Sequence, residues 1–465
     1  MNQNTEQLRT EPIGRLLFKL SLPAMIGMLV TALYNIIDTI FVARGIGASA
    51  VAAIGIAFPI QMILMAVSSA VGLGGASISS RKLGRGDDAG AAVTFLNVLV
   101  LVGLFAALAV SSAFFMLDDI LKVFGATTEI MDLSRQYLSV VLISSPFFMF
   151  TLASSAMVRA EGQAPYQMKV MLTTVLVNLV TTPLFIFTFD WGMYGAASST
   201  ALAQVIGSVL MLRFFFARKP KTELRFKWRQ FRIRFDEMKE IMAIGSSSFI
   251  MMVSQSILFV GVNVMLGTYG GTEELAIFAI INKFMALVGM PIMGIVQGMQ
   301  PIVGYNYGAE RFDRMRETIW TAMRAGIAIA VIIWLILQLF PQTLMGWFST
   351  DEALIAGGVT AIHILFAVSF LPSVQMLVNG IYQSLGKARV AMFLSLSRLT
   401  LYTIPLVFIL PSFLGVFGVW LAFPIADAMT FLTAVALAFW DRKFLFRPSE
   451  EDKEAHDVNP KATRL

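Results

Sequence analysis

The sequence contains no cysteine and few charged residues. Without cysteine among its 465 residues, disulfide bonds, thiolate metal sites and a cysteine nucleophile are excluded. Asp, Glu, Lys and Arg make up only 14% of the chain, whereas an average soluble domain carries about a quarter. So small a charged fraction cannot cover a water-exposed surface, which argues against a soluble globular protein.

Apolar sequence is plentiful instead. Hydrophobic residues make up 57% of the chain, and the mean hydropathy is +0.75. Apolar runs of about 20 residues recur along nearly the whole length, and each could cross a bilayer as a helix. The polar start contains Glu6 and Glu11 and lacks the basic region of a signal peptide, so we expect the first apolar run to be retained. The composition therefore predicts an all-α integral membrane protein.

We predict twelve transmembrane helices with both ends of the chain in the cytoplasm. The expected spans are 13–43, 50–80, 90–116, 132–159, 166–188, 192–216, 240–268, 274–305, 317–340, 354–384, 389–410 and 415–440. In this topology all but five of the 35 Lys and Arg residues lie on the cytoplasmic side, as the positive-inside rule requires. The five others are Arg44, Lys122 and Arg135 outside, and Lys283 and Arg398 within spans.

The chain contains an internal repeat. The stretch GGASISSRKLGRGD at 74–87 returns as GMQPIVGYNYGAER at 298–311, 224 positions later. Pro146 and Pro372, and also Gly162 and Gly386, recur at nearly the same offset. Each repeat holds six spans, an even number, so the pseudo-symmetry axis runs along the membrane normal. Such repeats are typical of transporters, and they predict two pseudo-symmetric six-helix lobes.

The repeat also sets the expected domain boundaries. We predict a first lobe over 13–216 and a second over 240–440, flanked by cytoplasmic segments 1–12 and 441–465. The linker 217–239 and its flank are basic, with ten Lys and Arg residues between Arg213 and Lys239. We interpret this run as a topology determinant that meets anionic lipid, and we expect no nucleic-acid partner.

Two carboxylates fall deep within the predicted spans. Each costs roughly 2.5–3.5 kcal/mol on insertion scales, so such a group usually faces a cavity or a partner. Asp38 has Tyr34 one helical turn before it, on the same face, and the pair predicts a wet pocket that holds a cation or proton. Asp427 has two possible basic partners, Arg398 and Lys283, so a structural charge network and a functional role both stay open.

Further polar side chains lie at membrane depth. Asn178 and Thr182 stand one turn apart in the fifth span, just before Pro183, which can free a backbone carbonyl toward a cavity. Thr200 adds a hydroxyl from the sixth span, whereas His363 in the tenth is expected to be a satisfied polar group. The second half offers an amide-rich lining: Gln255, Asn263, Gln297, Gln300, Asn379 and Gln383. We predict a substrate cavity from Tyr34, Thr31, Gln255, Gln297, Gln300 and Asn379.

Several ordered segments resemble MATE transporters, the multidrug and toxic compound extrusion family. They are LYNIIDTIFVARG, RAEGQAP, NLVTTPLFIF, YGAASSTALAQ, QGMQPIVGYNYGAERFDR, SLSRLTLYTIPLVFILP and GVWLAFPIAD, and the resemblance spans about 10–445. The branch looks DinF-like, similar to MepA-type bacterial drug exporters. The resemblance implies the MATE fold and Na+- or H+-coupled export of organic cations by alternating access between two lobes.

The resemblance also implies a coupling site in the first lobe. Asp38, Asn178 and Thr200 fall on the family's positions, with Tyr34 beside them, but Thr182 stands where the family usually has aspartate. A site with one carboxylate would bind Na+ more weakly, because hard-cation affinity follows ligand charge. We therefore prefer H+ to Na+ at Asp38 as the coupling ion, with no other cofactor. The branch with acids in the second lobe is disfavoured, because spans seven and ten contain none.

Two other functions compete with this antiporter. A lipid-linked oligosaccharide flippase of the same wider superfamily would need a more basic cleft than Arg398 and Lys283 supply. An intramembrane enzyme is disfavoured because the sequence holds neither HExxH nor GxSxG, and only His363 and His456 as histidines. We expect a non-enzymatic exporter of small organic cations that acts as a monomer in a bacterial or archaeal plasma (inner) membrane.

Overall fold

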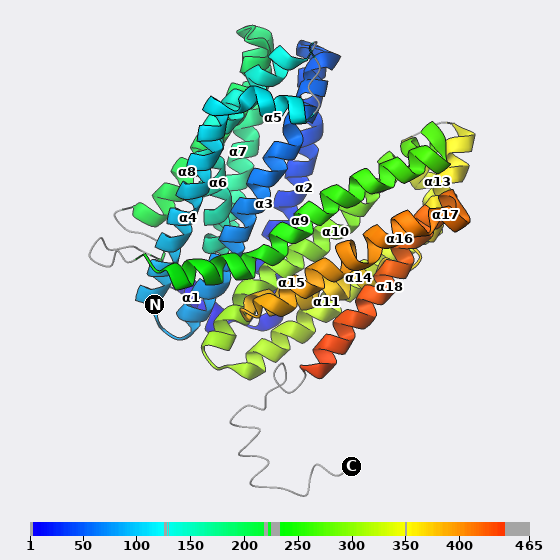
Figure 1. Ribbon diagram of the computed structural model, residues 1–465. Coiled ribbons are helices and arrows are strands. Elements are labelled where there is room, and N and C mark those ends of the chain that lie inside the picture. The colour runs from blue at the N-terminus through cyan, green and yellow to red at the C-terminus, as the bar shows by residue number, and fades with distance from the viewer. Residues whose placement is uncertain are drawn as a thin grey trace, which may run out of the picture. The chain divides into compact units, whose positions relative to one another are not determined.

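The computed structural model describes residues 3–124, 128, 130–217, 222–224, 233–348 and 351–441, and these residues fold into helices joined by short turns (Figure 1). The predicted cytoplasmic tail, 441–465, lies outside the described residues except for Asp441, as does much of the basic linker. An all-helical chain follows from the composition, because a helix satisfies every backbone hydrogen bond within its own segment inside lipid.

The helices follow one another along both halves of the chain. The first half contains α1 (Gln3–Thr10), α2 (Ile13–Gly45), α3 (Ala48–Gly84), α4 (Asp88–Phe115), α5 (Leu117–Val123), α6 (Met131–Ala160), α7 (Ala164–Pro183), the π-helical turn η1 (Leu184–Thr188) and α8 (Gly192–Phe216). The second half contains α9 (Phe235–Tyr269), α10 (Gly271–Gly308), α11 (Phe312–Leu339), α12 (Pro341–Gly346), α13 (Glu352–Leu365), α14 (Leu371–Ser384), α15 (Ala388–Leu396), the π-helical η3 (Ser397–Thr403), α16 (Ile404–Ile409), α17 (Pro411–Leu414) and α18 (Val416–Trp440).

Eleven helical stretches of the described chain are long and apolar enough to cross a membrane. The remaining predicted span, 354–384, consists of two helices, α13 and α14, separated by a turn at 366–370. Pro372 accounts for the break, because proline has no N–H to donate and its ring clashes with the carbonyl four residues earlier. The Val368 carbonyl accepts instead from the Leu371 N–H at 2.9 Å, and the Trp334 indole N–H donates to the Ala367 carbonyl at 3.0 Å, so the interrupted backbone keeps its partners.

One compact unit comprises residues 1–6, 22–79 and 87–252. Within it α6 packs against α4 and α8, and α8 also packs against α7. The first part of α9 joins this unit along α3, where a Cβ on Gly74 would lie 2.0 Å from the Ile241 carbonyl oxygen. Glycine is required at this crossing because any side chain would collide with the neighbouring backbone.

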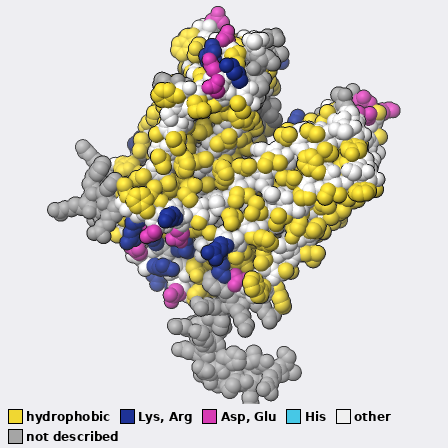
Figure 2. Space-filling model, in the orientation of Figure 1, with side chains coloured by type: hydrophobic (Ala, Val, Ile, Leu, Met, Phe, Trp, Pro, Cys, Tyr) yellow, Lys and Arg dark blue, Asp and Glu magenta, His cyan; other side chains and the backbone are white. Residues whose placement is uncertain are grey.

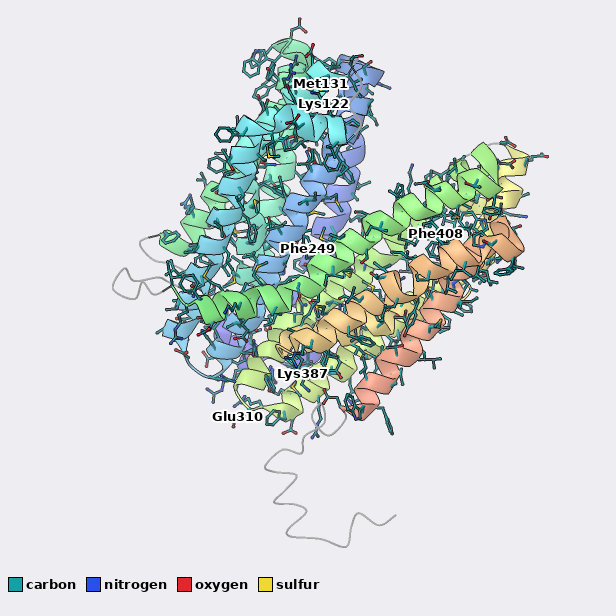
Figure 3. The ribbon with its side chains drawn as sticks, in the orientation of Figure 1. Lys122, Met131, Phe249, Glu310, Lys387 and Phe408 are labelled. Carbon is teal, nitrogen blue, oxygen red and sulfur yellow. The ribbon has the colours of Figure 1, made fainter. Side chains whose placement is uncertain are left out.

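The other compact unit comprises residues 7–21, 80–86 and 253–465. Its helix α10 packs against α11 and α14, and α18 packs against α14 and η3. Figure 3 shows Glu310 and Lys387 at the same end of these helices, and Phe408 toward the opposite end. The turns that follow α10 and α14 therefore lie on one side of the membrane, as the predicted topology requires.

Charged side chains gather at helix ends and apolar side chains cover the lengths between them (Figure 2). On α4, for example, Leu104 is 53% and Leu108 is 58% exposed. Side chains of this kind are expected on a surface that faces lipid. The molecule is thus a multi-pass membrane protein.

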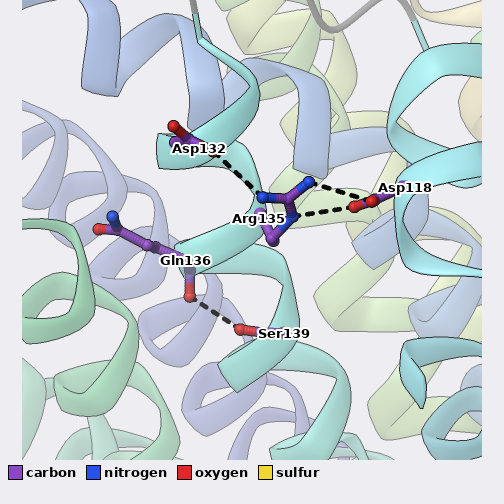
Figure 4. Close-up of polar contacts among 5 residues, drawn as sticks. All are labelled: Asp118, Asp132, Arg135, Gln136 and Ser139. Carbon is purple, nitrogen blue, oxygen red and sulfur yellow. Dashed lines mark hydrogen bonds and ion pairs between the residues drawn. The ribbon is translucent and has the colours of Figure 1, made fainter.

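Arg135, one of the five basic residues assigned away from the cytoplasm, is neutralised by neighbouring acids (Figure 4). Its Nε and Nη2 donate to the two oxygens of Asp118 at 2.9 and 3.0 Å, and Nη1 donates to Asp132 at 3.1 Å. The bidentate hydrogen bond from Arg135 holds the pKa of the Asp118 carboxyl below its usual range. These contacts join α5 to the start of α6.

Candidate functional site

A polar cluster in the first unit forms around Asp38. Asp38 lies on α2, Asn178 and Thr182 lie on α7, and Thr200 lies on α8. The Thr182 hydroxyl contacts Asp38 Oδ1 at 3.0 Å and Asn178 Oδ1 at 2.6 Å. Asn178 Nδ2 donates to Thr200 Oγ1 at 3.3 Å. The structure thus brings together all four residues predicted to form the coupling site.

Thr182 is the central member of this cluster. Its side chain is fully buried, and its hydroxyl also lies 2.8 Å from Ser199 Oγ. One hydroxyl carries one proton, so Thr182 can donate to Asp38 or to Asn178 but not to both at once. The protonation state of Asp38 therefore decides the direction of the hydrogen bonds around it.

Two tyrosines complete the cluster. The Tyr34 side chain lies beside Asp38 and Thr200, so the residue expected next to the carboxylate is there. Tyr137, from α6, is 6% exposed and lies beside Thr200, and Gln61 Nε2 on α3 donates to its hydroxyl at 3.2 Å. The cluster consequently draws on five helices of one unit.

Sequence reasoning missed part of this cluster, namely Gln61, Tyr137 and Ser199. Ser199 could have been found, because it precedes Thr200 in the YGAASSTALAQ segment. Gln61 stands alone in an apolar stretch and Tyr137 stands among several other polar residues, and no periodic pattern ties either of them to Asp38.

Thr31, predicted to line the substrate cavity, is half-buried two turns before Asp38. Its hydroxyl donates to the Gly27 carbonyl of its own helix at 3.0 Å.

The amides predicted in the second half are distributed over α9, α10 and α14. Gln255 is exposed and Gln297 is half-buried. Gln300 Nε2 donates to Gln383 Oε1 at 2.8 Å, which links α10 to α14. Asn379 is buried, and its Nδ2 donates to Ser395 Oγ at 3.0 Å. These amides belong to the second unit, where they act partly as interhelical hydrogen bonds.

The candidate charge network of the second half contains one ion pair. Arg398 Nε donates to Asp427 Oδ1 at 3.2 Å, and the Asp427 side chain is 9% exposed. Lys283 instead lies over the Phe348 ring, 5.3 Å from its centroid. His363 is exposed, and its Nδ1 lies 2.8 Å from Gln338 Oε1.

Glu161 is a buried acid that sequence reasoning did not single out. It follows α6 and is 2% exposed. Burial raises the pKa of its carboxyl from an ordinary 4.5 to about 7, although Thr222 and the backbone N–H groups of Glu223 and Leu224 donate hydrogen bonds that lower it. It lies in the RAEGQAP segment, where a charged loop residue would ordinarily be solvated.

Comparisons with a family model and with similar proteins both identify the family that the sequence segments resemble. The MatE family matches residues 23–184 and 247–409, so its two matches begin 224 positions apart. The multidrug export protein MepA of Staphylococcus haemolyticus (strain JCSC1435) is 27% identical over 431 residues, 92% of this chain and 93% of that protein. MepA of Staphylococcus aureus (strain N315) is 26% identical over 92% of this chain and 94% of that protein.

Solved structures extend the comparison to three dimensions. The MATE multidrug transporter DinF-BH, solved as a complex with a ligand, is 40% identical, and the match has a TM-score of 0.88 over 96% of this chain and all of that chain. A multidrug resistance MATE family transporter in an outward-facing conformation is 24% identical and shares the fold, with a TM-score of 0.88 over 98% of this chain and 99% of that one. Together with the helices described above, these matches confirm the predicted twelve-helix fold.

Proposed function

The chain belongs to the MatE family, and from this membership we propose that it is a secondary antiporter that exports cationic, amphipathic small molecules in exchange for protons. The relatives named as multidrug export proteins support the substrate class, as does DinF-BH, a multidrug transporter solved with a ligand bound. They do not favour the alternative of a lipid-linked oligosaccharide flippase.

The position of the Thr182 hydroxyl is the observation that favours H+ over Na+ as the coupling ion. It lies between Asp38 Oδ1 and Asn178 Oδ1, where the family usually has a second carboxylate. One carboxylate surrounded by neutral hydroxyls and an amide offers a hard cation little charge. A proton, in contrast, binds the carboxylate itself. The protonated Asp38 then needs only one hydrogen-bond acceptor for its O–H, and the Thr182 hydroxyl supplies it.

Protonation would reverse the hydrogen bonds of the cluster. When Asp38 is ionised, Thr182 donates to it, and Asn178 Oδ1 loses that donor. When Asp38 is protonated, it donates to Thr182, whose own proton then turns toward Asn178. Only the ionised state attracts a cationic substrate, so proton and substrate exclude each other at one carboxylate, which is the requirement for antiport.

The cellular setting follows from the same proposal. We place the protein in the plasma (inner) membrane with its termini in the cytoplasm, in agreement with the basic residues on that side. Transport would proceed by alternating access between two lobes, 13–216 and 240–440, in a single chain. Asp38, Asn178, Thr182 and Thr200 would couple the ion, and Tyr34 and Thr31 would face the substrate.

Transport in proteoliposomes tests the proposal. Ethidium movement would be followed under an imposed pH gradient and, separately, under an imposed Na+ gradient at the same ionic strength. We expect the pH gradient to drive transport and the Na+ gradient to have little effect. Asp119→Asn, which removes an exposed carboxylate, serves as the control for Asp38→Asn. Transport driven by Na+ alone would contradict proton coupling, and an active Asp38→Asn variant would exclude Asp38 as the coupling residue.

A further inference from the structure

Polar side chains continue from the Asp38 cluster along one face of α7. Thr182, Asn178, Thr174 and Gln167 follow one another at spacings of four, four and seven residues, which keeps them on the same side of the helix. Since α7 runs from the linker side toward the outer side in the predicted topology, this face leads from Asp38 toward the cytoplasm.

A second polar face lies on α6. Tyr137, Ser144, Thr151 and Ser154 recur at spacings of seven, seven and three, and Glu161 follows seven residues later, just beyond the end of the helix. Tyr137 belongs to the Asp38 cluster through Thr200. The α6 face therefore starts at the candidate coupling site and ends at the buried acid.

The faces meet at a third helix, α8. Thr200, Gln204 and Ser208 lie one turn apart on it, and Gly207 sits beside them. A Cβ on Gly207 would lie 2.8 Å from Thr174 Cγ2 and 3.5 Å from Thr151 Oγ1. The absence of a side chain at 207 thus brings the polar faces of α6, α7 and α8 together. We call the polar side chains of these three faces the polar column.

Several polar atoms of this column are buried without a hydrogen-bond partner among the described residues. They are Thr151 Oγ1, Ser154 Oγ, Gln167 Oε1 and Gln204 Oε1. Buried polar groups are nearly always satisfied, and those without a protein partner are usually satisfied by ordered water. Hydroxyls and waters in a row can pass a proton between them, and amides can hold such waters in place.

Glu161 ends the column under a cap from the linker. The Thr222 hydroxyl lies 2.8 Å from both oxygens of its carboxylate. The backbone N–H groups of Glu223 and Leu224 donate to Oε1 at 2.7 and 3.1 Å. Residues 222–224 thus cover the carboxylate.

Burial gives Glu161 an acidity suited to proton transfer. Its pKa is raised to about 7, chiefly by burial, and the negative charge of Glu223 in the cap raises it further. Arg159 lies two residues earlier on the same helix. If the cap opens, the carboxyl becomes hydrated and its pKa returns toward the ordinary 4.5, so the exposed acid would release its proton into neutral cytoplasm.

We propose that the polar column between α6, α7 and α8 conducts the coupling proton from Asp38 to the cytoplasm, and that Glu161 is its terminal proton acceptor. This inference rests on the proposed proton antiport. The proton leaves the Asp38 carboxyl, passes along the hydroxyls and waters of the column, which the amides help to hold in place, and binds the Glu161 carboxylate. It enters cytoplasmic water when residues 222–224 move away. The closed cap limits proton leak between transport cycles.

Glu161→Gln tests the terminal acceptor, because glutamine keeps the size and the hydrogen-bond acceptor but cannot take up a proton. Two assays in proteoliposomes separate the roles: ethidium transport driven by a pH gradient, and exchange of labelled for unlabelled ethidium, which needs no net proton movement. We expect the driven rate to fall by about 100-fold, the lower end of what a positioned proton acceptor contributes, with exchange unchanged. Asp119→Asn, which removes an exposed carboxylate outside the polar column, should transport like the wild type.

Driven transport by the wild type establishes the antiport itself, so failure of the proposed function is seen before any variant is compared. Equal loss of driven transport and exchange in Glu161→Gln would show a structural role and overturn the inference, as would an unchanged driven rate. Should Glu161→Gln not fold, Gln204→Leu decides, with Ser155→Ala as its control, since the Ser155 hydroxyl bonds its own helix at Thr151 O. Slower driven transport with intact exchange in Gln204→Leu supports the column, and an unchanged rate refutes it.

Discussion

Replacing either member of the Arg398–Asp427 pair should destabilise the protein, and by unequal amounts. Arg398→Met strands the Asp427 carboxylate, whose side chain is 9% exposed and cannot reach water easily. Breaking a buried pair in this way typically costs about 3–5 kcal/mol. Asp427→Asn strands Arg398 instead, whose side chain is 27% exposed, so its guanidinium can be partly rehydrated. The loss there should be closer to that of one charged hydrogen bond, about 1.5–3 kcal/mol.

The contact geometry supports a structural role for this pair. Only Arg398 Nε bonds Asp427, at 3.2 Å, so the interaction lacks the strength of a bidentate pair. Replacing both residues with apolar ones of similar volume removes the desolvation penalty together with the attraction. We therefore expect Arg398→Met with Asp427→Leu to melt near or above the wild type and to keep efflux.

Thermal unfolding of the purified variants in detergent, with efflux measured beside it, is the assay. Lys283→Met is the matched control, because Lys283 makes a cation–π contact with Phe348 worth about 0.5–1 kcal/mol at an exposed site. Equal melting temperatures for the two single variants would refute the argument from exposure. An Asp427→Asn protein that melts like the wild type but has lost efflux would make this pair a coupling site.

Three further outcomes are expected. Asp38→Asn should abolish coupled efflux while expression and melting temperature stay near those of the wild type, and a misfolded variant would show that the carboxylate is structural. Thr182→Asp should create a site with two carboxylates and strengthen stabilisation by Na+ at fixed ionic strength; strong, equal Na+ stabilisation of the wild type would place the ion elsewhere. For Glu161, the folded pKa of about 7 exceeds the ordinary 4.5, so its stabilising contribution is full below pH 4.5 and is lost as pH rises through 7. This loss amounts to about 3 kcal/mol of unfolding free energy, and it should be absent from the dependence of melting temperature on pH in Glu161→Gln. The same pH dependence in the wild type and in the variant would contradict the burial of this acid.

The sequence carried enough information for the membrane fold and for its repeat. Apolar runs and the distribution of Lys and Arg identify spans and their orientation, because lipid imposes one simple constraint on every segment that crosses it. The offset of 224 positions between 74–87 and 298–311 returns in the two MatE matches. The division of the tenth span at Pro372 could not be predicted from the sequence, because a proline alone does not imply a break. Proline is tolerated inside other helices of this protein, such as α6 at Pro146.

Part of the candidate site was also accessible from sequence. Asp38 is conspicuous because an acid at membrane depth is costly, and Asn178 and Thr182 are one helical turn apart. Periodicity places residues on a face of their own helix, but it does not say which other helix that face meets. For that reason Gln61 and Tyr137 became members of the cluster only in the folded chain.

Only the tertiary structure decided the state of Glu161. In the sequence it is a charged residue in a turn, and such residues are ordinarily hydrated. In the fold, residues 222–224, about sixty positions later, cover its carboxylate with a hydroxyl and two backbone N–H groups. The pKa of a carboxyl depends on the water and dipoles around it, and here those are set by contacts between segments distant in the chain. No local sequence pattern could therefore have predicted the raised pKa of Glu161.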